Sequence, residues 1–327
     1  MKLAAIADAI LDEGSSREVL RSALDAFVFQ CAQISGVYPD PSFNAWANDA
    51  LLESGVAINP HAAAHCAIDY QRSVVFIRGV HAAINTLKSR FPGAPLKILY
   101  AGCGPFATLL MPLLNRYAPH ELQVTLLDIH QASLDSVTLL LSHFELGDHQ
   151  VNTVKADACL YQHAEPLHLV VAETMQKSLE QEPQVAVTAN LAPQLLPAGF
   201  FIPQRIDITL CVINPEHENT LCPLAVIFEL TAEHAPRQAK YNHQHKALKL
   251  DAGIIEIPPL ADIAQRDAAL LSHITVFEQY CLKAYDSEIT LPAKCHGLAP
   301  LLAGARYRVS YLLGSYPRFN IEPLENL

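Results

Sequence analysis

The sequence lacks the features of a membrane protein and of a nucleic-acid-binding protein. In its 327 residues, no apolar run reaches the roughly 20 residues that a transmembrane helix needs, and the apolar run after Met1 is too short for a secretion signal. Basic residues are scarce, since 22 lysines and arginines stand against 33 acids. Phosphate binding needs clustered basic side chains, so we expect no nucleic-acid partner. From the missing apolar runs we expect no membrane contact and a cytoplasmic location.

Paired cysteines are also absent. The eight cysteines lie singly, mostly inside apolar runs, and none forms a Cys-x-x-Cys motif. This spread is typical of reduced, buried thiols rather than of a disulfide framework or a zinc site. We predict no metal site, because His61 and His65 have no third ligand nearby in the sequence. The histidines at positions 243, 245 and 296 are expected to face water.

The composition is that of a compact globular protein, with 51% hydrophobic and 17% charged residues. Residues 1–95 are predicted to be helical. A capping box at residues 15–18 precedes apolar residues at three- and four-residue steps. Trp46 is predicted to be a packing anchor. Residues 96–205 alternate short strands and helices, which predicts a mostly parallel, Rossmann-like α/β sheet. Residues 206–327 contain period-two segments, which predict a β-rich, barrel-like C-terminal region for substrate binding or dimerisation.

The segment Leu96–Phe106 carries the first functional signal. It reads as an apolar strand that ends in Gly102-Cys103-Gly104, before a helical pattern resumes. Glycines at such a turn allow the backbone to approach a ligand, and a following helix would offer unpaired N–H groups there. The turn therefore predicts a nucleotide or nucleoside site, although Gly-x-Gly alone also occurs in loops that bind nothing.

Acidic side chains follow the next three predicted strands. Asp128 ends the strand after Gly104 at roughly the spacing of an acid that binds ribose hydroxyls, and Asp157 and Glu173 end the third and fourth strands. Each of these acids, taken alone, could be an ordinary solvated residue. Together they indicate a ligand site at the C-terminal edge of the sheet.

On these residues the sequence resembles the class I S-adenosylmethionine-dependent methyltransferases. Gly102, Cys103 and Gly104 are similar to the first motif of that family, Asp128 with Ile129 to its ribose-binding segment, and Asp157-Ala158 to the segment beside the adenine. The resemblance implies S-adenosyl-L-methionine as cofactor.

A narrower resemblance, to the protein arginine methyltransferases, rests on other residues. Glu173 and Glu182 have the nine-residue spacing of the paired glutamates in that family, and the helix that carries Asp69 and Arg72 is similar to the one whose arginine binds the methionine carboxylate of the cofactor. Residues 199–205 resemble the entry into the β-barrel of that family. From the residues alone, an intramolecular ion pair with a neighbour such as Asp69 is an alternative for Arg72. For Glu182, which precedes Pro183, the alternative is a place in the first turn before a helix, where acids are favoured.

Departures from the pattern keep other functions open. Tyr100 replaces an acid of the first motif, Phe106 replaces its third glycine, and the Thr-His-Trp loop that closes the arginine pocket is missing. The leading hypothesis is a methyltransferase that acts on a guanidino or amine nitrogen of a small molecule or peptide, with Glu173 and Glu182 as catalytic residues. The alternatives are a C- or O-methyltransferase of natural-product biosynthesis and an inactive cofactor-binding protein. An NAD-dependent reductase is disfavoured because the third glycine is absent. The oligomeric state stays open, a homodimer included.

Overall fold

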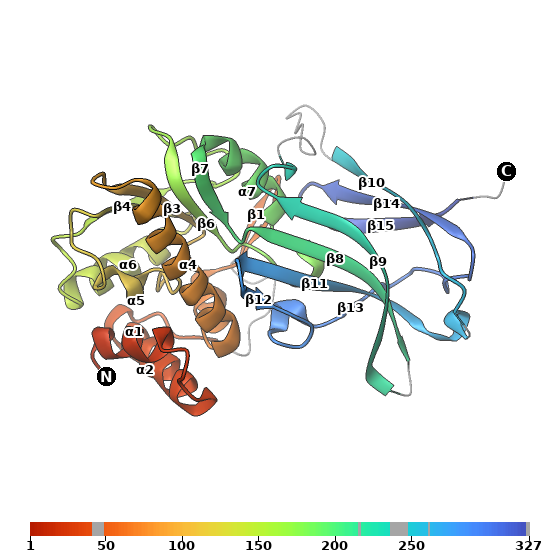
Figure 1. Cartoon of the computed structure of the whole chain (residues 1–327), viewed down its shortest axis with the longest axis horizontal. Coiled ribbons are helices and arrows are strands. Elements are labelled where there is room, and N and C mark those ends of the chain that lie inside the picture. Colours follow the sequence, from red (N-terminus) through yellow and green to blue (C-terminus); the bar gives the residue numbers. More distant parts are fainter. Residues whose placement is uncertain (41–48, 215–216, 236–247, 261, 325–327) are drawn as a thin grey trace.

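The computed structural model describes residues 1–40, 49–214, 217–235, 248–260 and 262–324. Trp46 and the histidines at 243 and 245 lie outside the described residues, so their predicted roles stay predictions. Helices and a parallel sheet occupy one end of the molecule and antiparallel sheets the other (Figure 1). This arrangement confirms the predicted fold class, an α/β sheet with a helical N-terminal region and a β-rich C-terminal region.

The N-terminal region is helical, with one exception. Ser16, rather than Ser15, caps the second helix by accepting a hydrogen bond from the Val19 N–H. The prediction of helices up to residue 90 is wrong at residues 50–57, which form an antiparallel hairpin. The elements are α1 (Leu3–Leu11), α2 (Arg17–Ser35), β1 (Ala50–Leu52), β2 (Gly55–Ala57), α3 (Pro60–Cys66) and α4 (Tyr70–Arg90).

The central sheet has five strands in the order β5-β4-β3-β6-β7, and every neighbouring pair is parallel. Strand β3 lies in the middle, and the order reverses there, because β4 and β5 extend to one side and β6 and β7 to the other. Open α/β sheets bind ligands beyond the C-terminal strand ends at such a switch point. The strands are β3 (Leu96–Ala101), β4 (Leu122–Asp128), β5 (Gln150–Lys155), β6 (Leu167–Ala172) and β7 (Leu195–Ile202).

The helix expected directly after Gly104 does not form there. Residues 105–110 make turns, and Ala107 has a left-handed φ of 43°, which a right-handed helix cannot contain. Only the four residues of α5 (Met111–Leu114) are helical, although the predicted apolar positions Phe106 and Leu110 are buried. The remaining helices of this half are α6 (Gln131–His143), η1 (Lys177–Leu179), α7 (Gln184–Leu191) and η2 (Ala192–Gln194).

The C-terminal region consists of two antiparallel sheets. One has the order β12-β11-β8-β9, with β13 also paired to β11, and the other has the order β10-β14-β15. The period-two segments predicted at 206–213 and 306–313 lie in β8 and β14. The elements are β8 (Arg205–Asn214), β9 (His217–Thr231), β10 (Leu248–Glu256), η3 (Ile263–Gln265), β11 (Asp267–Phe277), β12 (Tyr280–Leu282), η4 (Glu288–Thr290), β13 (Ala293–Lys294), β14 (Arg306–Leu313) and β15 (Arg318–Pro323).

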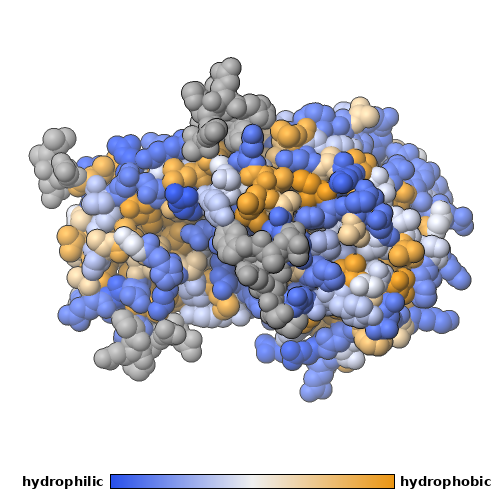
Figure 2. Space-filling model, turned by 180° about the vertical axis from the view of Figure 1, so that it is seen from behind, coloured by the Kyte–Doolittle hydropathy of each residue, from blue (hydrophilic) through white to orange (hydrophobic). Residues whose placement is uncertain are grey.

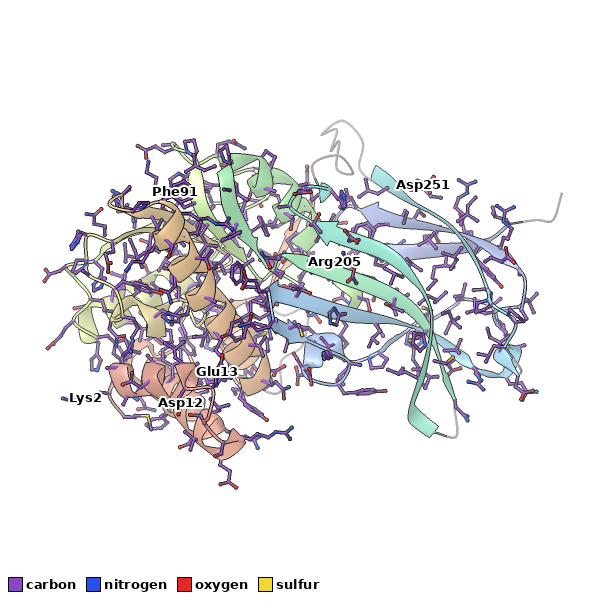
Figure 3. All side chains as sticks on the ribbon, in the orientation of Figure 1. Lys2, Asp12, Glu13, Phe91, Arg205 and Asp251 are labelled. Carbon is purple, nitrogen blue, oxygen red and sulfur yellow. The ribbon has the colours of Figure 1, made fainter. Side chains whose placement is uncertain are left out.

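Helix α4 joins the N-terminal helices to both sheet systems. Arg78 on α4 donates hydrogen bonds to the carbonyls of Ile10 and Asp12, each at 2.7 Å. The Tyr280 hydroxyl on β12 donates to Glu13 at 2.8 Å, and Figure 3 shows Asp12 and Glu13 beside α4. Helix α4 is therefore held by the end of α1 and by strands β11 and β12 of one C-terminal sheet.

The molecular surface mixes polar and apolar side chains. On the face opposite to that of Figure 1, hydrophilic side chains surround apolar ones that gather toward the middle (Figure 2). Within the described ranges, none of the helices combines the length and apolar character that crossing a bilayer requires.

Gly79 allows the close approach of α4 to β11 and provides a test of this contact. A Cβ atom at position 79 would lie 2.5 Å from Cγ1 of Val276, whose β-branched side chain is fully buried and stiff. We expect Gly79→Ala to lower the free energy of unfolding by about 1–3 kcal/mol through overpacking, although alanine favours a helix. Urea unfolding measures this change. Gly147→Ala, which meets open space, is the control, and equal stability of the two variants would contradict the contact.

Candidate functional site

A cavity opens at the C-terminal edge of the parallel sheet. It encloses about 980 Å³, open solvent at its mouth included. The ends of β3, β4 and β6, the segment after β5, helices α3 and α4, and the β1–β2 hairpin contribute to its walls. All ten residues predicted for the site line this one cavity: Arg72, Gly102, Cys103, Gly104, Asp128, Ile129, Asp157, Ala158, Glu173 and Glu182.

The glycine turn after β3 needs its glycines. Gly102 and Gly104 have left-handed φ angles of 66° and 63°. A Cβ atom at Gly102 would also lie 2.5 Å from Cγ2 of Thr174, so only glycine fits there without a shift. Between them, the Cys103 N–H donates to the Leu127 carbonyl of β4 at 3.1 Å. Because no helix starts at Gly104, the predicted helix N-terminus is not part of the site.

Asp128 at the end of β4 is fixed through both carboxylate oxygens. Oδ2 accepts a hydrogen bond from the Gly104 N–H at 2.9 Å, and Oδ1 accepts one from the His130 N–H at 2.8 Å. The side chain is 6% exposed, and its burial raises the pKa of the carboxyl, an effect that the two N–H donors oppose. Each oxygen can accept a further hydrogen bond, so Asp128 can receive hydroxyl groups of a ligand.

The segment after β5 forms the neighbouring wall. Asp157 Oδ1 accepts a hydrogen bond from the Cys159 N–H at 2.8 Å, which fixes the turn that carries Ala158. Ile129, which follows Asp128, also lines the cavity. Apolar Ala158 and Ile129 beside two carboxylates give this end the mixed character that a nucleoside would require.

Arg72 and Glu173 form a buried ion pair across the cavity. Their side chains are 11% and 9% exposed, and the Arg72 guanidinium donates to Oε2 of Glu173. Burial disfavours the charged guanidinium, but Glu173 outweighs this effect and raises the pKa of Arg72. Oε1 of Glu173 is buried and has no hydrogen-bond partner. A buried carboxylate oxygen without a donor is costly, which marks this atom as a binding point for a ligand donor.

The alternative partner of Arg72, Asp69, is engaged elsewhere. Asp69 caps α4 by accepting a hydrogen bond from the Arg72 N–H at 3.2 Å. Its second oxygen accepts bonds from the Ser287 hydroxyl at 2.6 Å and from the Glu288 N–H at 2.9 Å. Arg72 thus forms an intramolecular ion pair, as the alternative expected, but its partner is Glu173 rather than Asp69. Asp69 instead ties the start of α4 to the C-terminal region.

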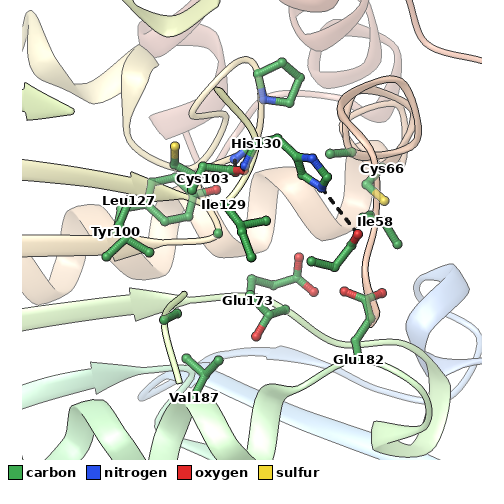
Figure 4. A pocket seen from close by; sticks show the side chains of 18 of the residues that line it. Ile58, Cys66, Tyr100, Cys103, Leu127, Ile129, His130, Glu173, Glu182 and Val187 are labelled. Carbon is green, nitrogen blue, oxygen red and sulfur yellow. Dashed lines mark hydrogen bonds between the residues drawn. The ribbon is translucent and has the colours of Figure 1, made fainter. Parts of the chain in front are cut away.

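Glu182 faces the same part of the cavity as Glu173. Figure 4 shows both carboxylates on the loop that follows β6, pointing into the space below the segment at Ile58. Glu182 is 7% exposed, and burial, followed by the charge of Glu173, raises the pKa of its carboxyl to about 8. Arg72 opposes this shift. Glu182 lies just before α7, whose N-cap is Pro183, as the alternative expected, and its carboxylate also lines the cavity.

Glu180, between the two glutamates in the sequence, faces away from the cavity. Burial raises the pKa of its carboxyl, and the nearby positive charges of Arg318 and His296 oppose the shift. These neighbours belong to the C-terminal region. Glu180 is therefore a natural control for experiments on Glu182.

The β1–β2 hairpin is the part of the site that sequence reasoning missed. The Val56 N–H donates to the Gln181 carbonyl at 2.8 Å, and a Cβ atom at Gly55 would lie 2.9 Å from that same oxygen. On the other side, the His130 ring bonds to the Ala57 carbonyl at 3.4 Å. The Ser54-Gly55 dipeptide is a turn signal that could have revealed the hairpin. Its residues in the cavity wall are Leu52, Val56 and Ala57, followed by Ile58.

The two departures from the motif also lie in the cavity wall. Tyr100 is 4% exposed and Phe106 is 1% exposed, and both contact the cavity. Burial raises the pKa of the Tyr100 hydroxyl, which keeps it neutral. An uncharged phenol thus stands where the related motif has an acid.

Histidines and cysteines provide no metal centre within the described parts of the chain. Groups of three or more His, Cys, Asp or Glu side chains suited to a metal ion are absent there. The His61 ring bonds to the Tyr38 carbonyl at 2.8 Å. All eight cysteines are free thiols.

The raised pKa of Glu182 predicts a pH dependence of stability. Its carboxyl has a pKa of about 8 in the folded protein, against an ordinary value of 4.5. Between these values the folded state binds more protons than the unfolded state, so the free energy of unfolding falls as pH rises. We expect Glu182→Gln to remove this contribution, which is at most about 1.4 kcal/mol per pH unit. Urea unfolding from pH 5 to 8.5 measures it, with the exposed Glu53→Gln as control. Parallel curves for Glu182→Gln and wild type would contradict the burial of this carboxyl.

Comparisons with known proteins give structural neighbours only. No protein-family model and no curated protein matches the chain. A chain of the Trypanosoma brucei PRMT1 enzyme–prozyme heterotetrameric complex with AdoHcy is similar at 13% identity and a TM-score of 0.48, over 80% of this chain and 96% of that one. Arabidopsis thaliana protein arginine methyltransferase 10, in an open conformation, is similar at 10% identity and a TM-score of 0.43, over 74% and 87%. Because both TM-scores lie below 0.5, the activity of this chain has to be inferred from its own residues.

Proposed function

We propose that the chain is an S-adenosylmethionine-dependent methyltransferase that acts on a guanidino or amine nitrogen of a small molecule or peptide. The observation that carries the proposal is the convergence of all ten predicted residues on one cavity at the switch point of the parallel sheet. The glycine turn follows β3, and Asp128, an acid suited to binding hydroxyls, ends β4. Two buried glutamates lie on the loop after β6. This combination suits a nucleoside-bearing cofactor beside a cationic acceptor.

The residues present fit the cofactor. The absence of a Cβ atom at Gly102 lets the turn pack against Thr174 at the cavity wall. Asp128 would accept hydrogen bonds from the ribose hydroxyls, and Ile129, Asp157 and Ala158 would hold the adenine side. Arg72 would bind the methionine carboxylate through its planar guanidinium, while it keeps Glu173 in place. When bound, S-adenosylmethionine supplies an electrophilic methyl group on a sulfonium sulfur.

Glu173 and Glu182 would bind the acceptor. The unpartnered Oε1 of Glu173 needs a donor, and a guanidinium or ammonium group has N–H donors to offer. With its pKa near 8, Glu182 is mostly protonated at neutral pH until a cation arrives, so binding a guanidinium would release a proton from Glu182. For an amine acceptor, the ionised Glu182 would instead take up the proton of the attacking nitrogen.

The remaining expectations belong to the same proposal. They are the domain division at residues 1–95, 96–205 and 206–327 and a cytoplasmic location, while the oligomeric state stays open, a homodimer included. The two alternatives make different demands on the site. A C- or O-methyltransferase acting on a neutral acceptor needs no pair of buried carboxylates, and an inactive cofactor-binding protein needs no acceptor at all. The orphaned oxygen of Glu173 therefore favours the nitrogen methyltransferase.

A direct assay separates these possibilities. The protein is incubated with isotopically labelled S-adenosylmethionine and a panel of guanidino and amino compounds, with phenols and activated carbon acids for comparison. Mass spectrometry then identifies products that are one labelled methyl group heavier. Methylation of a guanidino or amino compound supports the proposal. Methylation only of phenols or carbon acids supports the first alternative, and cofactor binding without turnover supports the second.

Asp128 tests the cofactor assignment. We expect Asp128→Ala to weaken binding of S-adenosylhomocysteine by roughly 1–3 kcal/mol, the usual cost of losing a charge-assisted bond to buried hydroxyls. Isothermal titration calorimetry measures the affinity. Asp135→Ala on the exposed side of α6 is the control and should bind like wild type. Unchanged affinity in a folded Asp128→Ala protein would refute the role of Asp128.

The glutamates test the chemistry. We expect Glu182→Gln to lower kcat/KM by about two to four powers of ten, or roughly 3–5 kcal/mol, while cofactor affinity stays the same. In the wild type, kcat/KM should rise with pH up to about 8, because only the ionised Glu182 binds the cation. Glu180→Gln, on the same loop but facing away, is the matched control. Full activity of Glu182→Gln on a guanidino or amine substrate would exclude this mechanism.

A further inference from the structure

The loop that carries Glu173 and Glu182 has an unusual backbone. Ser178, Leu179 and Gln181 have φ angles of 56°, 58° and 67°, a left-handed region that residues with side chains rarely adopt. Three such residues within four positions persist only where the surrounding structure determines the loop conformation. Since Glu182 follows directly, whatever holds these three residues also sets the place of its carboxylate.

The C-terminal region holds the loop at three successive points. The Ser178 N–H donates to the Ser272 hydroxyl on β11 at 3.0 Å. The Leu179 carbonyl accepts a hydrogen bond from the Tyr311 hydroxyl on β14 at 2.5 Å, and the Gln181 N–H donates to the Pro317 carbonyl at 2.8 Å. All three anchors lie about a hundred residues or more from the loop in sequence, so folding of the C-terminal sheets fixes the loop.

Tyr311 is a rigid anchor. Its side chain is fully buried, its ring stacks on Phe228 with centroids 5.6 Å apart, and Phe319 packs against it at 4.9 Å. The ring therefore cannot follow the loop if the loop moves. Burial raises the pKa of the Tyr311 hydroxyl, so the hydroxyl stays a hydrogen-bond donor across the ordinary pH range.

We propose that Tyr311, together with Ser272, is a positioning residue that sets the geometry of Glu182 from the C-terminal sheets. The inference rests on the proposed function for its effect on turnover, but not for its effect on the Glu182 carboxyl. The glycine turn and Asp128 lie at the ends of the parallel strands, where Asp128 is held by the Gly104 and His130 N–H groups. The anchors on β11 and β14 then act on the acceptor side of the site through Glu182, while the ribose side is held by the parallel sheet.

The test is the variant Tyr311→Phe, which removes the hydroxyl and keeps the aromatic packing. Tyr307→Phe is the matched control, because Tyr307 lies on the same strand, is 4% exposed, and its hydroxyl accepts a hydrogen bond from the Leu302 N–H at 3.2 Å, away from the loop. Ser272→Ala is the second variant, with Ser310→Ala as its control. Ser310 is also buried and donates to the Asn320 carbonyl.

The first readout needs no turnover. The carboxyl of Glu182 is followed by NMR in protein labelled with ¹³C in the glutamate side chains and is assigned with Glu182→Gln. Its pKa of about 8 depends on burial and on the charges that face it, which are Glu173, Arg72 and Asp49. We expect Tyr311→Phe to lower this pKa by about one unit or more, since a loosened loop admits water to the carboxyl. Tyr307→Phe should leave it at the wild-type value.

The second readout is catalysis. We expect Tyr311→Phe and Ser272→Ala to lower kcat/KM for the acceptor about tenfold or more and to shift the rise of the pH profile to lower pH, with unchanged affinity for S-adenosylhomocysteine. If the protein proves not to be a methyltransferase, the NMR titration still decides the positioning role. Wild-type titration of Glu182 in both variants, or effects equal to those of Tyr307→Phe and Ser310→Ala, would overturn the proposal.

Discussion

The site depends on three ionisable groups held out of water: the Arg72–Glu173 ion pair and Glu182 beside it. One guanidinium faces two carboxylates, so the group has one more acid than base, and burial makes that excess expensive. The protein relieves the cost by raising the pKa of Glu182, which keeps the second acid mostly neutral at pH 7. A cationic ligand would restore the charge of Glu182 and would supply the donor that Oε1 of Glu173 lacks. Under the proposed function, structural stability and acceptor recognition would depend on the same atoms.

The fold brings these groups together from distant parts of the chain. Arg72 comes from α4, whose start is tied to the C-terminal region through Asp69. Glu173 directly follows β6, the strand next to β3 in the parallel sheet. Glu182 is placed by a left-handed loop that the C-terminal sheets anchor. The hairpin at residues 50–57 then covers the loop and reaches the neighbourhood of Asp128 through His130. The cavity lies at the C-terminal edge of the parallel sheet. Helix α4, the loop after β6 and the hairpin supply further walls, against which an acceptor would bind.

Much of the site was predictable, because parallel strands end at one edge and their C-terminal residues meet there. Gly102, Asp128 and Glu173 follow strands that the sequence marks clearly, and their convergence follows from the strand pattern. Other features depend on contacts that no local pattern encodes. The partner of Arg72 lies 101 residues away, and the turn at Ala107 replaces a helix that apolar spacing favoured. The left-handed backbone at Ser178 and Leu179 is stabilised by tertiary hydrogen bonds. Because neither residue is a glycine, the sequence carries no local signal of this conformation.

We propose that one cavity binds a nucleoside-bearing cofactor beside two acidic acceptor-binding residues. A crystal structure of the protein with S-adenosylhomocysteine tests this most directly. We expect ribose hydroxyls bonded to Asp128 and the ligand carboxylate at Arg72, with Glu173 and Glu182 facing the sulfur. Ligand density outside this cavity, or within it but away from Asp128 and Arg72, would refute the proposed site.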